Sequence, residues 1–169
     1  MTSQDPTITE FVQRDYPRLV NAVALVTGSY PEAEDLVQEA LARAWSRIDR
    51  GLTIDSLPNW VAAVALNLSR SRWRRLVVER RALERMDVTP AAPPDDVQAD
   101  VARALATLPR RQREVSVLRY LMAMPTREVA EVLGISEGTV KNSLSKARDA
   151  LAIQLAIEDE EVGSDVEDR

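Results

Sequence analysis

The sequence predicts an all-α protein made of two small helical domains joined by a proline-rich acidic linker. Hydrophobic residues make up 45% of the 169 residues and aromatic residues only 4%, so a core would pack mainly through aliphatic side chains. Only five glycines occur, and apolar residues recur at helical spacing along most of the chain. A chain of this length has room for one or two small domains.

The first helical pattern covers residues 8–27, where Pro17 either bends one helix or starts a second helical segment. Gly28 ends this pattern, and a more regular helix is expected over residues 31–48. Its apolar residues recur at i, i+3 and i+4, which predicts one continuous buried stripe. The stripe consists of Ala33, Leu36, Val37, Ala40, Leu41, Ala44 and Trp45.

The opposite face of this helix presents a compact polar patch, formed by Asp35, Gln38 and Glu39 at the same i, i+3, i+4 spacing. The patch is a candidate partner-binding surface. The alternative is a solvated face, because acids near a helix N-terminus are already favoured by the helix dipole.

A third helix is predicted over residues 59–86, with a buried side and a polar flank. The buried side consists of Trp60, Val61, Val64, Ala65 and Leu68. Asn67, Arg70 and Arg74 lie along the flank, and Trp73 lies among arginines off the buried side. An aromatic ring and an asparagine among guanidinium groups suit unpaired nucleic acid, because they combine phosphate binding with stacking and hydrogen bonding to bases. The alternative is an arginine-rich surface with a half-buried tryptophan packed against a neighbouring element.

The helical pattern collapses at DVTPAAPPDDVQAD, which contains three prolines and four acids and predicts a linker over residues 86–97. Helical character then resumes and is divided at Leu108 and Pro109. The second part supplies a core face, formed by Val115, Val117, Leu118, Leu121 and Met122.

Residues 126–151 predict two short helices joined by a tight turn. Thr126 is a good N-cap residue for the first helix, Gly134 is a usual helix stop, and Ser136 can cap the second. One side of the second helix is apolar through Val140, Leu144, Ala147 and Leu151. The other side carries small, hydrogen-bonding and charged residues, namely Glu137, Gly138, Lys141, Asn142, Ser145, Lys146 and Arg148.

Such a helix suits a recognition helix that enters the major groove N-terminus first and places its basic residues against phosphate. Helix-turn-helix patterns have frequent false positives, and the alternative is an ordinary amphipathic hairpin in a helical bundle.

Basic charge is clustered even though the net charge of the chain is −5. Seven acids and one arginine occupy residues 158–169, so the rest of the chain is slightly basic. Residues 70–85 hold seven arginines against two glutamates, and local patches of this kind decide phosphate binding. The acidic tail has few apolar residues and is expected to be disordered. It is either a solubilising end or an electrostatic cover for the basic C-terminal domain.

Composition also excludes several classes of site. The chain has no cysteine and no histidine, which removes disulfides, thiolate or imidazole metal sites and catalytic triads that need an imidazole base. We find no glycine-rich phosphate loop, and we expect no catalytic residue, no cofactor and no metal site. No apolar run approaches the roughly 20 residues of a membrane span and the N-terminus resembles no signal peptide, so we expect a cytoplasmic protein without direct membrane insertion.

Three blocks of the sequence, in order, resemble the two-domain extracytoplasmic-function (ECF) sigma factors of bacterial RNA polymerase. AEDLVQEALARAW resembles the region 2 helix that docks on the polymerase clamp, and NWVAAVALNLSRSRWRR resembles the segment that opens and reads the −10 element. Residues 108–151 resemble region 4. The resemblance implies region 2 over residues 8–85 and region 4 over residues 98–157. The disordered tail would then cover residues 158–169.

The resemblance also implies roles for individual residues. Asp35, Gln38 and Glu39 would contact the clamp. Asn67 would hold a flipped promoter base beside the loop of residues 51–56, on the surface that also carries Arg70, Trp73 and Arg74. The helix that reads the −35 element would carry Glu137, Gly138, Lys141, Asn142 and Ser145. Three positions depart from residues common in the family, which weakens any transfer of promoter sequence: Leu66, Ser71 and Ser143.

The predicted function is therefore that of a sigma factor, with core RNA polymerase and promoter DNA as partners and, by resemblance, an anti-sigma factor as a third. The alternative is a stand-alone helix-turn-helix transcriptional regulator in which residues 1–85 sense a signal or dimerise. A metal-dependent nuclease is a weaker alternative, because no periodic segment gathers a cluster of acids.

Overall fold

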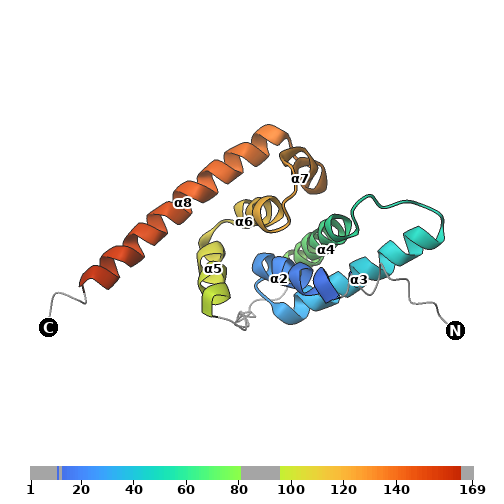
Figure 1. The fold of residues 1–169 in the computed structure, drawn as a ribbon, viewed down its shortest axis with the longest axis horizontal. Helices are drawn as coiled ribbons and strands as arrows, with labels where there is room; N and C mark the ends of the chain where they lie inside the picture. The colour runs from blue at the N-terminus through green and yellow to red at the C-terminus, as the bar shows by residue number, and fades with distance from the viewer. Residues whose placement is uncertain (1–10, 12, 81–95, 165–169) are drawn as a thin grey trace.

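The computed structural model describes the backbone of residues 11, 13–80 and 96–164, and the side chains of residues 11, 13–75 and 99–154. All regular elements in these residues are helices, which confirms the all-α prediction (Figure 1). The predicted linker of residues 86–97 lies outside the described residues except at its end, where residues 96 and 97 begin a helix.

Three helices form an N-terminal bundle: α2 (Tyr16–Thr27), α3 (Tyr30–Asp49) and α4 (Leu57–Arg80). Each packs against the other two. Their contact surfaces are aliphatic, and the fully buried side chains include Leu19, Val23, Leu36, Val37, Val61 and Leu66. Burial of such side chains contributes about 1.5–3 kcal/mol each, so this core holds the three helices in fixed orientation.

Local signals set the helix ends of this bundle. Pro17 lies in the first turn of α2, so it starts a second helical segment and does not bend a single helix. Gly28 ends α2 with φ +78°, a left-handed conformation that favours glycine. The hydroxyl of Ser29 then accepts a hydrogen bond from the Glu32 N–H at 3.3 Å and caps α3.

Two details of the predicted cores are wrong. Trp45 is 39% exposed, because the C-terminal part of α3 extends beyond the other two helices of the bundle (Figure 1). On α4, Ala62, Leu66 and Ser69 are buried in addition to part of the predicted side. The reason is that α4 contacts α2 and α3 and also α7, so its covered surface is wider than one helical stripe.

The C-terminal unit begins with α5 (Asp96–Thr107) and α6 (Arg110–Ser116), divided at Leu108 and Pro109 as predicted. A π-helical stretch, η1 (Val117–Leu121), continues α6, and the Met122 N–H bonds the Val117 carbonyl at 3.1 Å, five residues back. Of the predicted core face in this segment, only Leu121 is incompletely buried.

The predicted helix-turn-helix is present as α7 (Thr126–Leu133) and α8 (Glu137–Ser164). Gly134 ends α7 with φ +62°, and the Ser136 hydroxyl caps α8 by accepting from the Thr139 N–H at 3.1 Å. The predicted cap at Thr126 is wrong: Pro125 occupies the N-cap position and Thr126 is the first helical residue.

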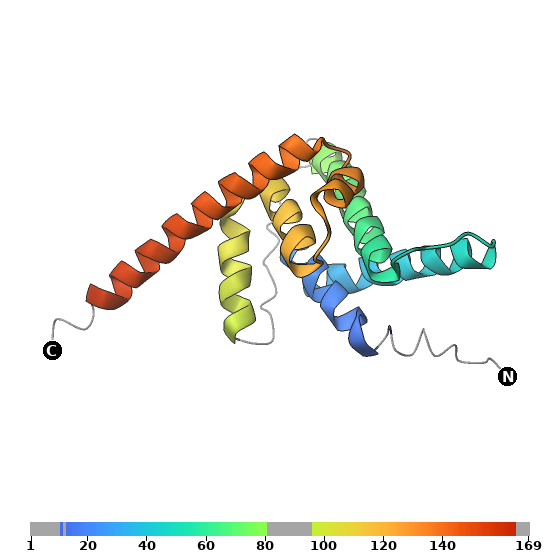
Figure 2. The ribbon, with the colours of Figure 1, turned by 45° about the horizontal axis from the view of Figure 1, so that its top comes forward.

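The acidic tail of residues 158–169 was predicted to be disordered. In the structure, α8 instead continues as one helix through residues 158–164 (Figures 1 and 2). Glutamate is a good helix former, and extending an existing helix needs no new nucleus. The side chains of residues 158–169 lie outside the described ones, so an electrostatic cover over the basic C-terminal domain stays a prediction.

The two units contact each other directly. α2 lies against α5, α6 and η1, and α4 lies against α7 (Figure 2). Within the described residues, no helix combines the length and the apolar character that crossing a membrane requires.

Candidate nucleic-acid interface

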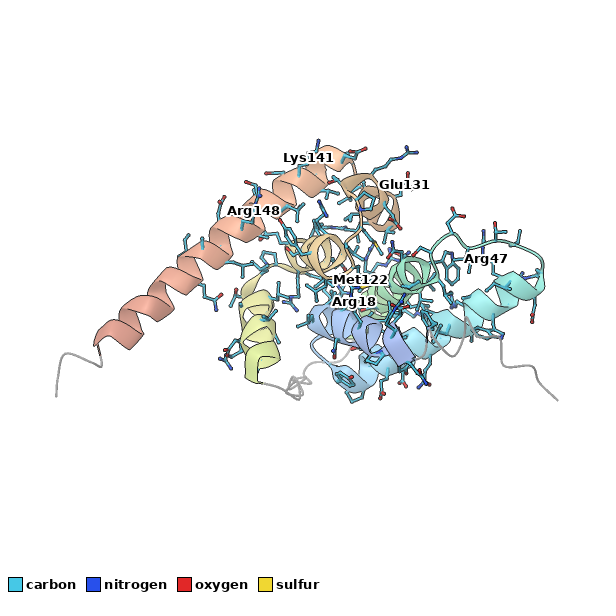
Figure 3. The ribbon with its side chains drawn as sticks, viewed as in Figure 1. Arg18, Arg47, Met122, Glu131, Lys141 and Arg148 are labelled. Carbon is cyan, nitrogen blue, oxygen red and sulfur yellow. The ribbon has the colours of Figure 1, made fainter. Side chains whose placement is uncertain are left out.

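The outer side of α8 carries the residues predicted to read duplex DNA. Glu137, Gly138, Lys141, Asn142, Lys146 and Arg148 are exposed, and Ser145 is half-buried. Figure 3 shows Lys141 and Arg148 on the side of α8 that faces away from α6. No hydrogen bond or ion pair engages the side chains of Lys141, Lys146 or Arg148 among the described residues.

The inner side of α8 explains why these residues face outward. Val140, Leu144 and Ala147 are buried, and α8 packs on α6 and α7. Ser143 is also buried, with 8% of its surface exposed. Its departure from the family pattern therefore lies on the core side of the helix and leaves the outer face unchanged.

The flank of α4 is only partly accessible. Asn67, Trp73 and Arg74 are exposed, and Trp73 has 52% of its surface exposed, as expected for a ring off the buried face. The Arg70 side chain is only 20% exposed. The structure therefore brings three of the four predicted −10 residues to the surface and covers the fourth with the C-terminal unit.

Arg70 lies between the two units in a poorly satisfied position. Its Nε is 3.3 Å from Oε1 of Glu114, and its Nη1 is 3.5 Å from the Leu133 carbonyl, a long hydrogen bond. Nε and Nη2 are both buried and have no hydrogen-bond partner among the described residues. Burial lowers the pKa of the Arg70 guanidinium, Glu114 opposes this effect, and the neighbouring arginines add to it.

Glu114 organises the basic residues at this contact, and sequence reasoning missed it. It is 2% exposed and binds Arg110 at 3.1 Å and Arg111 at 3.5 Å in addition to Arg70. The spacing within RRQRE could have indicated the two pairs inside α6, because i, i+3 and i, i+4 residues are neighbours on a helix. The contact with Arg70 could not have been found, because it joins residues 44 positions apart through tertiary structure.

Arg110 also reaches the N-terminal bundle. Its Nη2 donates to the Ser69 hydroxyl at 2.9 Å, and its guanidinium lies 5.5 Å from the centre of the Trp73 ring, within cation–π range. The ring expected to stack on a base is thus in contact with a cation of the other unit.

Arg113 and Arg18 join the two units through helix carbonyls. Arg113 donates to the carbonyls of Leu105, Ala106 and Leu108 at the end of α5 and to that of Val26 in α2. Arg18 of α2 donates to the Leu121 carbonyl at the end of η1, and it lies beside Met122 in Figure 3. Burial and Arg110 lower the pKa of Arg113, with Glu114 opposing them. Cations at helix C-terminal ends are favoured by the helix dipole.

One of the three residues in the acidic patch of α3 is held by ion pairs that the sequence did not predict. Asp35 and Gln38 are exposed. Both carboxylate oxygens of Glu39 are engaged, by Arg43 at 2.6 Å and by Arg72 of α4 at 2.9 Å. Burial is the largest single influence on the pKa of Glu39 and raises it, but the hydrogen bonds and charges of Arg43 and Arg72 together outweigh burial and hold that pKa below its ordinary value.

No group of three or more acidic, histidine or cysteine side chains in the described part of the chain could hold a metal ion.

Comparison with known proteins places the chain in a family. The sigma-70 region 2 family matches residues 11–77, and the sigma-70 region 4 family matches residues 98–151. The chain is 31% identical over 156 residues to the RNA polymerase sigma-E factor of Streptomyces coelicolor, with 89% of this chain and 86% of that protein covered. It is 35% identical over 145 residues to the ECF RNA polymerase sigma factor SigL of Mycobacterium tuberculosis, covering 77% and 78% of the two chains.

Solved structures agree with this assignment. The sigma factor RpoE from Bartonella quintana, in complex with the anti-sigma factor NepR, has a TM-score of 0.70 and 27% identity, with 88% of this chain and 96% of that chain covered. CnrH, in complex with the cytosolic domain of CnrY, has a TM-score of 0.62 at 25% identity and 91% coverage of both chains.

Two matched regions with a helix-turn-helix in the second define a sigma factor, and the chain belongs to the ECF sigma factors of the sigma-70 family. As a sigma factor, it binds core RNA polymerase and directs promoter-specific initiation of transcription. The matches to both sigma regions favour this function over that of a stand-alone regulator.

Proposed function

We propose that this sigma factor divides promoter recognition between two surfaces. The −35 surface is the outer side of α8, where Asn142 reads base edges and Lys141, Lys146 and Arg148 bind phosphate. The −10 surface is the flank of α4, where Asn67, Arg70, Trp73 and Arg74 bind the unpaired strand. Asp35, Gln38 and Glu39 of α3 form the contact with the polymerase clamp.

One observation supports the division most strongly: the polar outer side of α8 stands opposite a buried aliphatic seam and carries cations that have no partner among the described residues. Its N-terminal half bears Gly138 and other small residues, so the helix can approach a groove closely. On α4, an exposed tryptophan and asparagine beside arginines offer stacking, hydrogen bonds and charge together.

Strand opening follows from differential binding in this proposal. The −10 surface binds unpaired bases and not duplex, so it shifts the equilibrium toward the open promoter without hydrolysis of a nucleotide. The chain itself contributes no catalytic step. The protein acts in the cytoplasm and is held in reserve by an anti-sigma protein, as RpoE of Bartonella quintana is bound by NepR.

In vitro transcription with core polymerase on a pool of genomic promoter fragments tests this function. The full chain should start transcripts at a defined subset of fragments. Lys141→Ala should weaken initiation at all of them and Asn67→Ala should impair opening after duplex binding, as seen by permanganate footprinting of unpaired thymines. Transcripts that begin at no defined site would refute the proposal.

A further inference from the structure

We propose that the C-terminal half of α3 is a further DNA-binding site, at which a row of arginines holds phosphates of the unpaired promoter strand. The α3 arginine row consists of Arg43, Arg47 and Arg50. This inference rests on the proposed function, because it takes the −10 surface of α4 as the place where the unpaired strand is bound.

The three arginines lie along one flank of the helix. Their i, i+4, i+7 spacing makes successive members of the row neighbours on the surface of α3 and its C-cap. At a rise of about 1.5 Å per residue the row covers about 10 Å. A single strand carries one phosphate per about 3.4 Å of stacked length, so a row of this length matches about three phosphates.

Only one acid is paired with the row among the described residues. Glu39 binds Arg43 at 2.6 Å, but it also binds Arg72 of α4 at 2.9 Å. One carboxylate is therefore shared between two guanidinium groups, and the Arg43 side chain is still 55% exposed. The pair leaves an excess of positive charge at the edge between α3 and α4.

The other two arginines have no acidic partner in the described part of the chain. Nε of Arg47 is buried without a hydrogen-bond partner among the same residues. Arg50 is exposed and donates only to Ser46, to its carbonyl at 2.8 Å and to its hydroxyl at 3.3 Å. A guanidinium whose donors are incompletely used by the protein is suited to bind phosphate.

The row ends at the loop that leads into α4. The Gly51 N–H bonds the Ile48 carbonyl at 2.8 Å, and the Leu52 N–H bonds the Arg47 carbonyl at 3.2 Å, so the loop starts in a fixed position on the end of α3. Figure 3 shows Arg47 on this part of α3. Because α4 packs against α3, a strand bound at Asn67 of α4 can continue over the loop onto the arginine row.

Neutralising single phosphates tests the site in the complete initiation complex. Core polymerase with the full chain is bound to a promoter fragment from the transcription assay, with its −10 segment kept unpaired by mismatches. A methylphosphonate replaces one phosphate at a time on each strand, and competition binding measures the affinity. In the wild type, neutralising two or three adjacent phosphates beside the −10 bases should weaken binding about two- to tenfold each, the range for a single charged contact.

Matched variants assign those phosphates to the row. Arg50→Gln is the main variant because Arg50 is exposed, and Arg47→Gln extends the test to the half-buried member. Arg103→Gln is the control: it removes the same charge from an exposed arginine of α5 that pairs with Asp100. Each row variant should bind the unmodified DNA about two- to tenfold more weakly, and neutralising its phosphate should then have no further effect. Arg103→Gln should keep the wild-type pattern.

Three results would overturn the proposal. The first is the same methylphosphonate pattern in Arg50→Gln, Arg47→Gln and the wild type. The second is weaker binding of the row variants to core polymerase without DNA, which would assign the row to a protein contact. The third is a lower melting temperature with unchanged DNA affinity, because cations at the end of a helix also stabilise the helix dipole. Asn67→Ala and Arg74→Ala without effect on the same DNA would instead refute the proposed −10 surface, whatever the row variants show.

Discussion

The basic residues of α8 and those of α4 differ in what holds them. On α8, Lys141 and Lys146 have no side-chain partner among the described residues. On α4, Arg70 is held by Glu114 and Arg72 by Glu39 at 2.9 Å. Similar positive charge in the sequence thus corresponds to unpaired lysines on α8 and to at least two arginines of α4, Arg70 and Arg72, that are held by acids.

The difference has a structural cause. α8 projects from one edge of region 4, and only its inner side is packed (Figure 2). α4 contacts α3 within region 2 and α7 of region 4, and acids of both regions reach its arginines: Glu39 of α3 pairs with Arg72, and Glu114 of α6 pairs with Arg70. Under the proposed function, α8 offers its cations to duplex DNA as folded, whereas Arg70 of α4 would have to exchange Glu114 for a phosphate.

The largest effect should come from the acid that holds Arg70. Glu114→Ala should lower the free energy of unfolding by about 3 kcal/mol, because it leaves the guanidinium groups around a buried position without their counter-charge. Glu137→Ala, on the exposed start of α8, should change it by less than about 1 kcal/mol. Urea unfolding of both variants measures the contrast, and equal losses would show that the burial of Glu114 is energetically unimportant.

The next largest effect concerns base preference, which should differ between variants of α8 and variants of α4. Asn142→Ala should change discrimination among −35 duplexes by about 1–3 kcal/mol, the range for one bidentate contact to a base. Asn67→Ala should leave duplex discrimination unchanged and alter binding of single-stranded −10 DNA. Competition binding with base-substituted duplexes and single strands checks both, and an identical duplex profile for Asn142→Ala and the wild type would remove Asn142 from the reading surface.

The salt dependence of DNA binding should show which cations are not held in an ion pair within the protein. Lys146→Ala should reduce the slope of log K against log salt for duplex binding by about 0.9, the value for one phosphate contact. On single-stranded DNA, Arg74→Ala should reduce the slope by about 0.7, and Arg72→Ala by clearly less, because Glu39 neutralises Arg72. Fluorescence anisotropy over a salt series measures the slopes. Equal slopes for the two α4 variants would mean that the ion pair with Glu39 opens freely in solution.

The smallest effect concerns pH. Because the pKa of Glu39 is lowered in the folded protein, its ionised form contributes stability that is present above the unfolded pKa of about 4.3 and is lost as pH falls through the folded value. Glu39→Gln should therefore be slightly less stable than the wild type at neutral pH, and this difference should vanish in acid. Carboxyl chemical shifts followed over pH measure the folded value directly, and a midpoint at or above about 4.3 would contradict the ion pairs.

Much of the fold could be predicted from local pattern. The aliphatic periodicity of α2, α3 and α8 and the cap at Ser136 are local features, and the structure confirms them. Pro17 lies at the start of α2, which was one of the two alternatives that its position left open. The failures have a tertiary cause. Trp45 was predicted to be buried but is exposed, because the C-terminal part of α3 extends beyond the neighbouring helices. Leu66 is buried outside the predicted stripe, because α4 contacts more than one partner.

The candidate site divides in the same way. Which residues of α8 face outward follows from its helical period, so the sequence pattern is enough to select Lys141, Asn142 and Arg148. The restraint on Arg70 does not follow from any local pattern, because Glu114 lies on another helix and in another region. A helical period determines which side of a helix is polar, but it does not determine what lies against that side.

The sequence by itself determined the helical class, the two regions with their family, and the outward face of α8, because each depends on residues within a few turns of one another. Only the tertiary structure decided that region 4 lies on region 2, that one buried glutamate gathers arginines from both, and that the −10 surface is partly covered. These features depend on contacts between residues distant along the chain, which neither composition nor periodicity encodes.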